Sequence, residues 1–296
     1  MNFILRKTVE IKLIKNIFTY KNEQNMKNLD WFFELFKKQK PIIAMAHLPA
    51  LPGTPRYGKH KGVKHIIEWV RRDVAHLTKA GVDAIMFCNE DDRPYVFEAG
   101  LEQVATMSRV IAETKPKDMP FGVDFLWDPV AATAIAHATE ADFIREVFTG
   151  VFESDMGFWS PNAGKVARFR SQIGADDIKV FYNVVPEFSS PLGSRSPVER
   201  ACGAVVSSLA DAILVSGIRA GEEANISVIK EIKKNVEVPV FVNTDVKPEN
   251  VKEYLTVADG AIVGSSLKID GYTWNEVDPL RVKMLMREVD ELRSQI

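Results

Sequence analysis

The pattern of apolar and polar positions from Pro41 onward repeats a single unit. Short apolar runs alternate with longer amphipathic stretches, which is typical of parallel strands buried on both faces and covered by crossover helices. The chain contains eight such runs, and each is expected to form one strand. They are Ile42–His47, Asp83–Cys88, Phe121–Phe125, Ala141–Val147, Lys179–Val184, Asp211–Val215, Val238–Val242 and Gly260–Val263.

The stretches between these runs carry helical spacing. Val63, Ile66, Val70 and Leu77 recur at intervals that place them on one face of a helix, and Gly81 is a residue that ends helices. A last helix is expected from about Asp278 to Arg293. An opening helix near Leu29–Lys38 carries Trp31, Phe32, Leu35 and Phe36, which we expect to plug the bottom of a barrel.

A weak internal repeat supports the same fold. The segments Ala80–Ile85, Leu209–Val215 and Val257–Val263 each read as a helix end, an aspartate and then a strand. Eight units of this kind predict an α/β fold of the (β/α)8 or TIM-barrel type, with residues 26–296 as one domain. A doubly wound open sheet is the alternative, but it would leave some of the units unexplained.

The first 25 residues form a separate N-terminal extension, expected to be disordered or helical. They are basic and amphipathic, so they could form a membrane-surface helix or a targeting segment. The simpler interpretation, which we favour, is upstream sequence before a true start at Met26.

Composition excludes several classes of protein. The net charge of -2 provides no basic field for nucleic acid, and no apolar run is long enough to span a membrane. The two cysteines, Cys88 and Cys202, have no partners with metal-site spacing, so each is expected to be a reduced thiol in a cytoplasmic protein.

If the chain forms this barrel, the residues that follow the strands converge on one face, where barrel enzymes keep their active sites. This position filter selects candidate catalytic residues, namely His47, Asp124, Glu146 and Asn183. It also selects candidate residues for binding substrate or phosphate, namely Asn89, Arg145, Ser216, Gly217, Asn243, Thr244, Gly264 and Ser265.

The loop after the last strand is the most specific signal. Gly264 lets backbone N–H groups approach an anion, and Ser265 and Ser266 add hydroxyl donors, so we expect phosphate there. The alternative is a tight turn in which glycine only relieves strain. Lys268 could add a positive charge or lie in solvent.

Ionisable groups near the same face suggest acid/base chemistry. His47 has a side chain whose ordinary pKa lies near neutrality, so it is the first candidate for proton transfer, although it could instead orient a loop. Arg145 could grip a phosphate or carboxylate, or form a buried ion pair. Glu90, Asp91 and Asp92 could help hold a divalent cation such as Mg²⁺, but a solvated acidic loop is favoured and we assign no metal ligand.

Several segments between Pro41 and Arg281 resemble the BtpA/SgcQ family. They are His47–Gly53, Gly81–Asp83 followed by Asn89 and Asp92–Pro94, Asp142–Arg145, and Asp259–Gly271. The resemblance implies a barrel and carries two labels, a photosystem I biogenesis factor in cyanobacteria and an enzyme of a sugar operon in other bacteria. Neither label defines a reaction.

The chain also departs from this family pattern. The family has Asp after the fifth strand, followed by Lys-His, where this chain has Asn183 and Glu187-Phe188. A glycine-serine-glycine turn after the seventh strand is replaced by Asn243-Thr244-Asp245, and Asp124 stands where the family has Asn. These differences indicate a divergent subfamily with another ligand.

Two functions therefore stand. The first is an enzyme of carbohydrate metabolism that acts on a small phosphorylated metabolite, a sugar phosphate in the simplest case, by lyase, isomerase or hydrolase chemistry. The alternative is a non-catalytic assembly factor that associates peripherally with a membrane through residues 1–25. The expected partner is a small phosphorylated molecule, and helix contacts could support a homo-oligomer.

Overall fold

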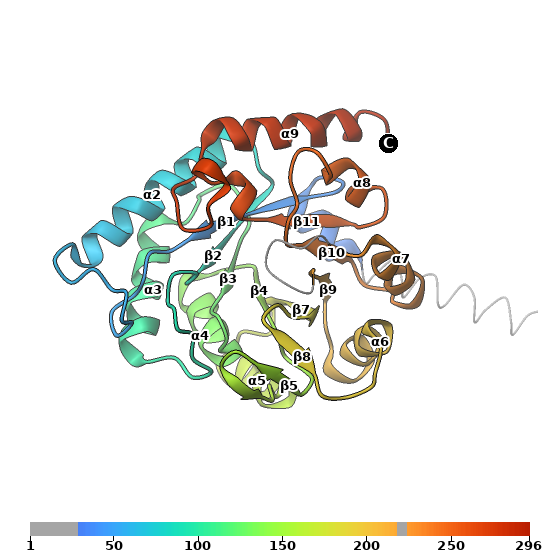
Figure 1. Ribbon diagram of the computed structural model, residues 1–296, viewed down its shortest axis with the longest axis horizontal. Coiled ribbons are helices and arrows are strands. Elements are labelled where there is room, and N and C mark those ends of the chain that lie inside the picture. The colour runs from blue at the N-terminus through green and yellow to red at the C-terminus, as the bar shows by residue number, and fades with distance from the viewer. Residues whose placement is uncertain (1–28, 218–223) are drawn as a thin grey trace, which may run out of the picture.

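The computed structural model describes residues 29–217 and 224–296. Eight parallel strands close into a barrel in the spatial order β1-β11-β10-β9-β7-β4-β3-β2, which confirms the expected fold (Figure 1). Helices surround this ring. The barrel strands are β1 (Ile42–His47), β2 (Ala84–Cys88), β3 (Phe121–Asp124), β4 (Phe143–Glu146), β7 (Lys179–Val185), β9 (Ala212–Val215), β10 (Val240–Asn243) and β11 (Gly260–Val263).

The helices cover the outside of the barrel through their apolar faces. In α2, the side chains of Ile66, Val70 and Leu77 are buried, as their spacing predicted. The helix ends at Gly81, which has a left-handed φ of 83° and donates its N–H to the carbonyl of Thr78. The helices are α2 (Gly62–Ala80), α3 (Leu101–Thr114), α4 (Pro129–Thr139), α5 (Ala163–Gln172), α6 (Pro197–Ser208), α7 (Ile226–Asn235), α8 (Val251–Leu255) and α9 (Pro279–Arg293).

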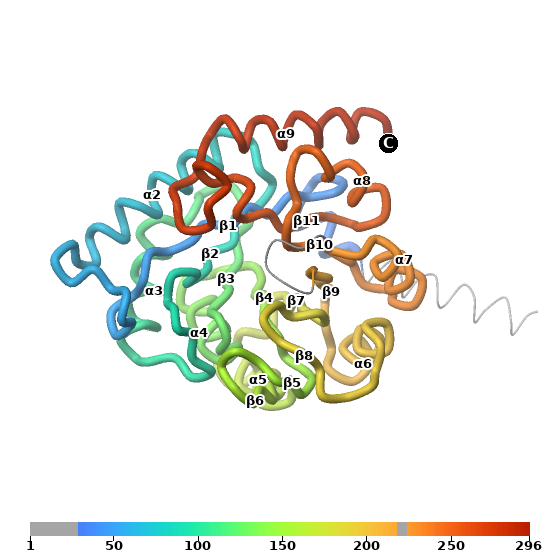
Figure 2. Tube along the Cα trace, in the orientation of Figure 1, coloured from blue at the N-terminus to red at the C-terminus, as the bar shows by residue number. Residues whose placement is uncertain are grey.

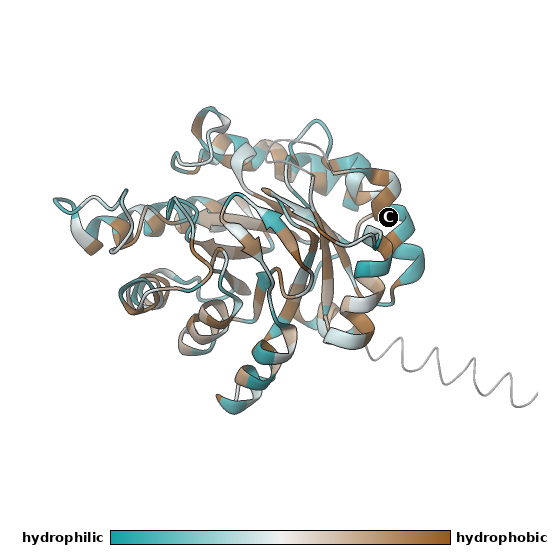
Figure 3. Ribbon diagram, turned by 60° about the horizontal axis from the view of Figure 1, so that its bottom comes forward, coloured by the Kyte–Doolittle hydropathy of each residue, from teal (hydrophilic) through white to brown (hydrophobic). Residues whose placement is uncertain are grey.

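Aromatic side chains fill the lower part of the barrel. Phe143, Phe181 and Phe241 come from β4, β7 and β10, and the rings of Phe143 and Phe181 stack 4.9 Å apart. A helical segment at residues 29–36 packs Phe32 and Phe36 against these rings, so the expected bottom plug is present. In Figure 3 the strands are brown and the outer faces of many helices are teal, as this burial requires.

Four aspartates tie neighbouring strands together at the bottom of the barrel, and they explain the internal repeat. Each one precedes a strand and accepts a hydrogen bond, through its side chain, from the backbone N–H at or near the start of the strand before it. Asp83 accepts from Ile42, Asp142 from Phe121, Asp211 from Val180 and Asp259 from Val240, at 2.7 to 2.9 Å. We call these four the strand clamps. Strands β2 and β9 start one residue later than the sequence pattern predicted, and β4 and β10 start two residues later.

Two insertions build a small sheet that the sequence pattern did not predict. It contains β5 (Phe152–Ser154), β6 (Gly157–Trp159) and β8 (Ser189–Pro191) in the antiparallel order β6-β5-β8. Its strands are three residues long, too short to carry a visible period. In Figure 2 the labels of β5, β6 and β8 lie together in the lower part of the view.

Two expectations concern membranes: that no segment spans one, and that residues 1–25 could lie on the surface of one. Among residues 29–217 and 224–296, no helix is long and apolar enough to cross a membrane. The extension at residues 1–25 lies outside the described residues.

Candidate active site at the barrel mouth

The top of the barrel is lined by polar side chains because side chains alternate along each strand. Every second residue points inward, so apolar residues such as Ile43 and Met45 in β1 are followed by His47 at the same inner face. The same alternation brings one inner residue from each strand to the carboxyl end. These are His47, Cys88, Asp124, Arg145, Asn183, Ser216, Asn243 and Gly264.

Arg145 and Asp124 form a buried ion pair at this level. Arg145 Nη1 lies 2.5 Å from Asp124 Oδ2, and the two side chains are 9% and 0% exposed. Burial alone would lower the pKa of Arg145, but the charge of Asp124 raises it overall. Asp124 therefore fixes a permanent positive charge inside the barrel mouth.

Glu146 is a second buried carboxyl group near this ion pair. Burial, followed by the nearby charge of Asp124, raises the pKa of Glu146 well above its ordinary value. Asp124 Oδ1 and Glu146 Oε1 are buried and have no donor among the described residues while both groups are ionised. The raised pKa favours the protonated, neutral form of Glu146.

His47 is held as a neutral ring. Burial, and then the charge of Lys268, lower its pKa from 6.5 to about 3. Its Nδ1 lies 3.0 Å from the carbonyl oxygen of Thr273, which can only accept, so Nδ1 carries the proton. Nε2 is then an acceptor. The pKa of His47 therefore lies well below the ordinary value of histidine, because the ring is buried and feels the charge of Lys268.

Glu90 has the titration behaviour that the sequence assigned to His47. Burial, the charge of Glu187 and then that of Asp124 raise the pKa of Glu90 from 4.5 to about 7. Its Oε2 accepts a hydrogen bond from Cys88 Sγ at 3.5 Å and lies 3.8 Å from His47 Nε2. A carboxyl group with this pKa can both take up and release a proton near neutral pH.

Side chains at the carboxyl ends of β7, β9 and β10 form a continuous chain of hydrogen bonds. Asn183 Nδ2 donates to Ser216 Oγ at 3.0 Å, and Ser216 Oγ donates to Asn243 Oδ1 at 3.0 Å. Asn243 Nδ2 reaches Thr244 Oγ1 at 3.4 Å, and Thr244 donates to Glu187. The structure therefore brings four of the predicted residues together as one network.

The loop after β11 packs directly on His47. A Cβ atom added to Gly264 would lie 3.3 Å from Cε1 of His47, so glycine permits this close approach. Ser265 Oγ lies 2.8 Å from Thr273 Oγ1, and Ser266 Oγ donates to the carbonyl of Val246 at 2.5 Å. Lys268 does not point its charge towards a ligand at this loop, because its side chain is fully buried against Asp73.

A cavity of about 450 Å³ occupies the barrel mouth. Six of the predicted site residues line it, namely His47, Arg145, Asn243, Thr244, Gly264 and Ser265. The others lie beside or beneath it and are not among the lining residues. These are Asn89, Asp124, Glu146, Asn183, Ser216 and Gly217.

Asn89 has a role in holding loops. Its side chain accepts from the N–H of Leu126 at 2.8 Å and donates to Asp92 at 3.1 Å. Asp92 in turn accepts from the N–H of Leu51 and the hydroxyl of Thr54. These contacts join the loops after β1, β2 and β3, which explains why polar residues stand at positions 89 and 92.

Sequence reasoning missed lining residues that include Tyr95 and Trp274. Tyr95 and Trp127 form one wall, and Trp274 reaches the cavity from the loop after β11. Trp274 Nε1 donates to the carbonyl of Glu90 at 3.2 Å, and the guanidinium of Arg93 lies 3.4 Å from its ring centre. No sequence pattern marks Trp274, because its contacts join loops about 180 residues apart.

No ligand set for a metal is assembled in the described part of the chain, where no three His, Cys, Asp or Glu side chains are grouped to hold an ion. A cation such as Mg²⁺ bridging enzyme and substrate stays a prediction.

Comparisons with known proteins agree with this architecture. A family model described as the BtpA family matches residues 38–291. The Escherichia coli sgc region protein SgcQ is 40% identical over 90% of this chain and 100% of its own length. The photosystem I biogenesis protein BtpA of Synechocystis is 29% identical over 88% of this chain and 91% of its own length.

Solved structures show the same fold at low identity. Thiamine phosphate pyrophosphorylase from Pyrococcus furiosus superposes with a TM-score of 0.53 at 15% identity, covering 86% of this chain and 96% of that one. At this identity the similarity concerns the barrel alone.

Proposed function

The chain belongs to the BtpA family, and from that premise and the chemistry of the barrel mouth we propose that it is an enzyme acting on a small phosphorylated metabolite. A sugar phosphate is the proposed substrate class. The reaction is proton transfer of the kind that lyases, isomerases and hydrolases share. A solved barrel of the same fold is named for a phosphorylated compound, thiamine phosphate, which is compatible with this substrate class.

One observation carries the proposal. A single cavity is lined by a glycine-serine loop, a buried guanidinium and a carboxyl group with a pKa of about 7. The loop at Gly264 and Ser265 would hold the phosphate through backbone N–H groups and the Ser265 hydroxyl, as the corresponding loop of phosphate-binding barrels does. Arg145 would hold a second oxygen of the substrate and stabilise negative charge that develops on it.

Glu90 and His47 have different tasks in this proposal. Glu90 takes a proton from the substrate or returns it, because its carboxyl is partly protonated near neutral pH. Neutral His47 accepts a hydrogen bond from a substrate hydroxyl through Nε2 and orients it. Asp124 holds Arg145 by their ion pair, Glu146 lies near this pair, and Asn183 supports the rim through Ser216. Their predicted catalytic roles remain part of the proposal.

Ligand binding tests the proposal first. Phosphorylated sugars, with inorganic phosphate and the unphosphorylated sugars alongside, are screened for a rise in thermal stability. We expect at least one phosphorylated sugar to stabilise the protein, and Gly264→Ala to weaken that effect. Gly193→Ala is the matched control, since a Cβ atom at Gly193 meets nothing within 4 Å.

Turnover tests it second. The ligands that bind are incubated with the protein and followed by NMR for conversion. Glu90→Gln should keep binding and lose conversion. If no phosphorylated sugar binds, or if Glu90→Gln converts as fast as the wild type, the proposal is wrong.

The assembly-factor alternative has one comparison in its favour, the similarity to a protein named for photosystem I biogenesis. Its expected membrane contact, residues 1–25, lies outside the described residues. Cell fractionation of the full chain and of a chain that starts at Met26 separates the two proposals, because only an assembly factor anchored by this segment loses membrane association.

A further inference from the structure

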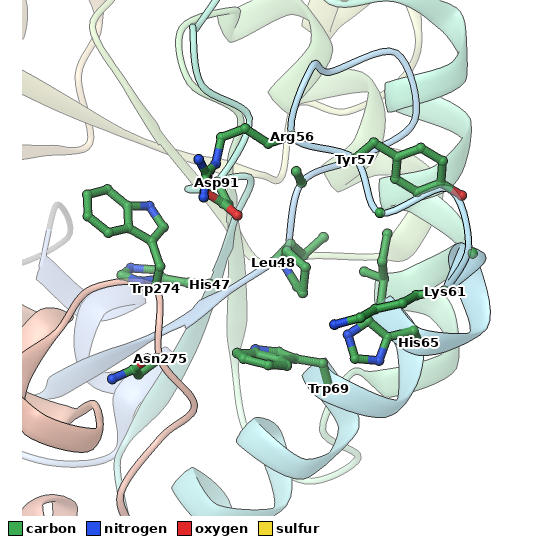
Figure 4. Close-up of a pocket in the computed structure, with 15 residues that line it drawn as sticks. His47, Leu48, Arg56, Tyr57, Lys61, His65, Trp69, Asp91, Trp274 and Asn275 are labelled. Atoms are coloured by element: carbon green, nitrogen blue, oxygen red, sulfur yellow. Dashed lines mark hydrogen bonds and ion pairs between the residues drawn. The ribbon is translucent and has the colours of Figure 1, made fainter.

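A second cavity of about 220 Å³ lies next to the barrel mouth. We call it the outer cavity. Its walls are the loop after β1, the first turns of α2 and the loop that precedes α9. Figure 4 shows Lys61, His65 and Trp69 on one side of it and Trp274 and Asn275 on the other.

The outer cavity adjoins the mouth cavity. His47 and Trp274 line both of them. Trp274 is held in place by its hydrogen bond to the carbonyl of Glu90 and by the guanidinium of Arg93 on its ring. A molecule long enough to span both cavities would therefore contact His47 and Trp274.

The charges of the outer cavity favour an anion. Arg56, Lys61 and His65 line it, together with a single acidic residue, Asp91. Asp91 is already paired, with Arg56 at 2.8 Å and with Arg93 at 2.7 Å. No carboxylate lies within ion-pair distance of Lys61 in the described ranges of the chain, so the charge of Lys61 is left for a ligand.

The remaining walls limit the size and kind of ligand. Leu48 and Ile66 are buried apolar residues, and the rings of His65 and Trp69 meet edge to face at 6.0 Å. Lys61 itself is exposed, so water screens part of its attraction for an anion. A compact anionic group on a short carbon chain fits a cavity of this volume.

We propose that the outer cavity binds a second anionic group at the far end of the substrate, held by Lys61. The substrate is then a phosphorylated metabolite with another phosphate or carboxylate several atoms away from the first. The proposal rests on the proposed function, because it assumes that the mouth cavity takes a phosphorylated molecule. It adds that the enzyme selects against substrates with one charged end.

Two probes that differ only at the far end test this selection. 6-Phosphogluconate and sorbitol 6-phosphate share a six-carbon chain and a phosphate, but only the first has a carboxylate opposite the phosphate. We expect the wild type to bind 6-phosphogluconate about two- to fivefold more tightly, the range of one exposed ion pair. Lys61→Met should remove this preference. Lys59→Met, the same change at an exposed lysine two positions away that does not line the cavity, should keep it.

Tryptophan signals separate this proposal from the proposed function. The indole N–H of Trp69 reports on the outer cavity and that of Trp127 on the mouth cavity. If both probes bind equally well and shift Trp127 alone, the outer-cavity proposal is wrong while the proposed function stands. If neither probe binds, inorganic phosphate is titrated as a third probe of the outer cavity. A shift of Trp69 in the wild type that is absent in Lys61→Met supports an anion site in the outer cavity, and no shift overturns it.

Discussion

Lys268 Nζ lies 3.0 Å from Asp73 Oδ2, and both side chains are fully buried between α2 and the loop after β11. Asp73 also accepts the N–H of Val277 through Oδ1 at 2.8 Å. The pair therefore anchors the loop that carries Ser265, Thr273 and Trp274 to a helix about 200 residues earlier in the chain.

Breaking this pair should destabilise the protein strongly. Lys268→Met leaves the carboxylate of Asp73 buried without its cation, and we expect the free energy of unfolding to fall by about 3–5 kcal/mol. The double variant Lys268→Met/Asp73→Asn should recover most of this loss, because no uncompensated charge remains. Urea denaturation measures both. Lys252→Met, which removes exposed pairs with Glu288 and Glu291, serves as control and should leave stability nearly unchanged.

Arg145→Met should act in the same way inside the mouth. It removes the cation that neutralises Asp124, next to the carboxyl of Glu146, so the expected loss is again about 3–5 kcal/mol. Binding of phosphorylated ligands should fall as well. Arg71→Met removes an exposed partner of Glu113 and should leave both properties nearly unchanged. Equal effects of the two substitutions on denaturation midpoints would contradict the buried ion pair.

Glu90 should make the stability depend on pH in an unusual direction. The pKa is 4.5 in the unfolded chain and about 7 in the folded one. Between these values the folded protein keeps a proton that the unfolded chain has lost, so the contribution of Glu90 to stability is present at pH 4.5 and is lost as the pH rises through 7. Stability of Glu90→Gln relative to the wild type should rise by about 3 kcal/mol from pH 4.5 to pH 8. A difference that stays constant across denaturation curves in this range would show that the carboxyl titrates normally.

His47 should have the opposite dependence. Its pKa is 6.5 in the unfolded chain and about 3 in the folded one, so the unfolded chain takes up a proton that the folded protein refuses. Stability is then highest above pH 6.5 and falls as the pH is lowered towards 3. At pH 5 the loss should be about 2 kcal/mol. His47→Gln lacks it, and NMR titration of the His47 ring gives the folded pKa directly. A measured value near 6.5 would refute the neutral buried ring.

The sequence predicted the barrel because each strand is a short apolar run and each helix has apolar residues at intervals of three and four. Strand β1 was predicted with the limits that the structure has, and the plug formed by Phe32 and Phe36 followed from spacing alone. The small sheet β5-β6-β8 was not predicted, because three residues per strand give no period and its pairing joins insertions after two different barrel strands.

The site could be predicted only in part, because position along a strand is local whereas electrostatics are not. Strand ends identified His47 and Arg145 as residues facing the mouth. Burial and then the charge of Lys268 lower the pKa of His47, and burial and then the charge of Glu187 raise the pKa of Glu90. Neither charged partner is near in sequence. Asn89 was placed at the mouth by the same rule, but its amide is occupied by backbone and side-chain groups of neighbouring loops.

The strand clamps have a consequence at the other end of the barrel. Each clamp links the beginnings of two neighbouring strands through a single side-chain hydrogen bond, as Asp83 does for β1 and β2. A slip of one residue between such strands would break that bond and also turn inner side chains towards the helices, since side chains alternate. The strand clamps thus fix the register of these pairs of strands. In the register that Asp83 fixes, His47 of β1 is paired with Cys88 of β2. Hydrogen bonds at the bottom of the barrel thus help to determine which side chains face one another at its mouth.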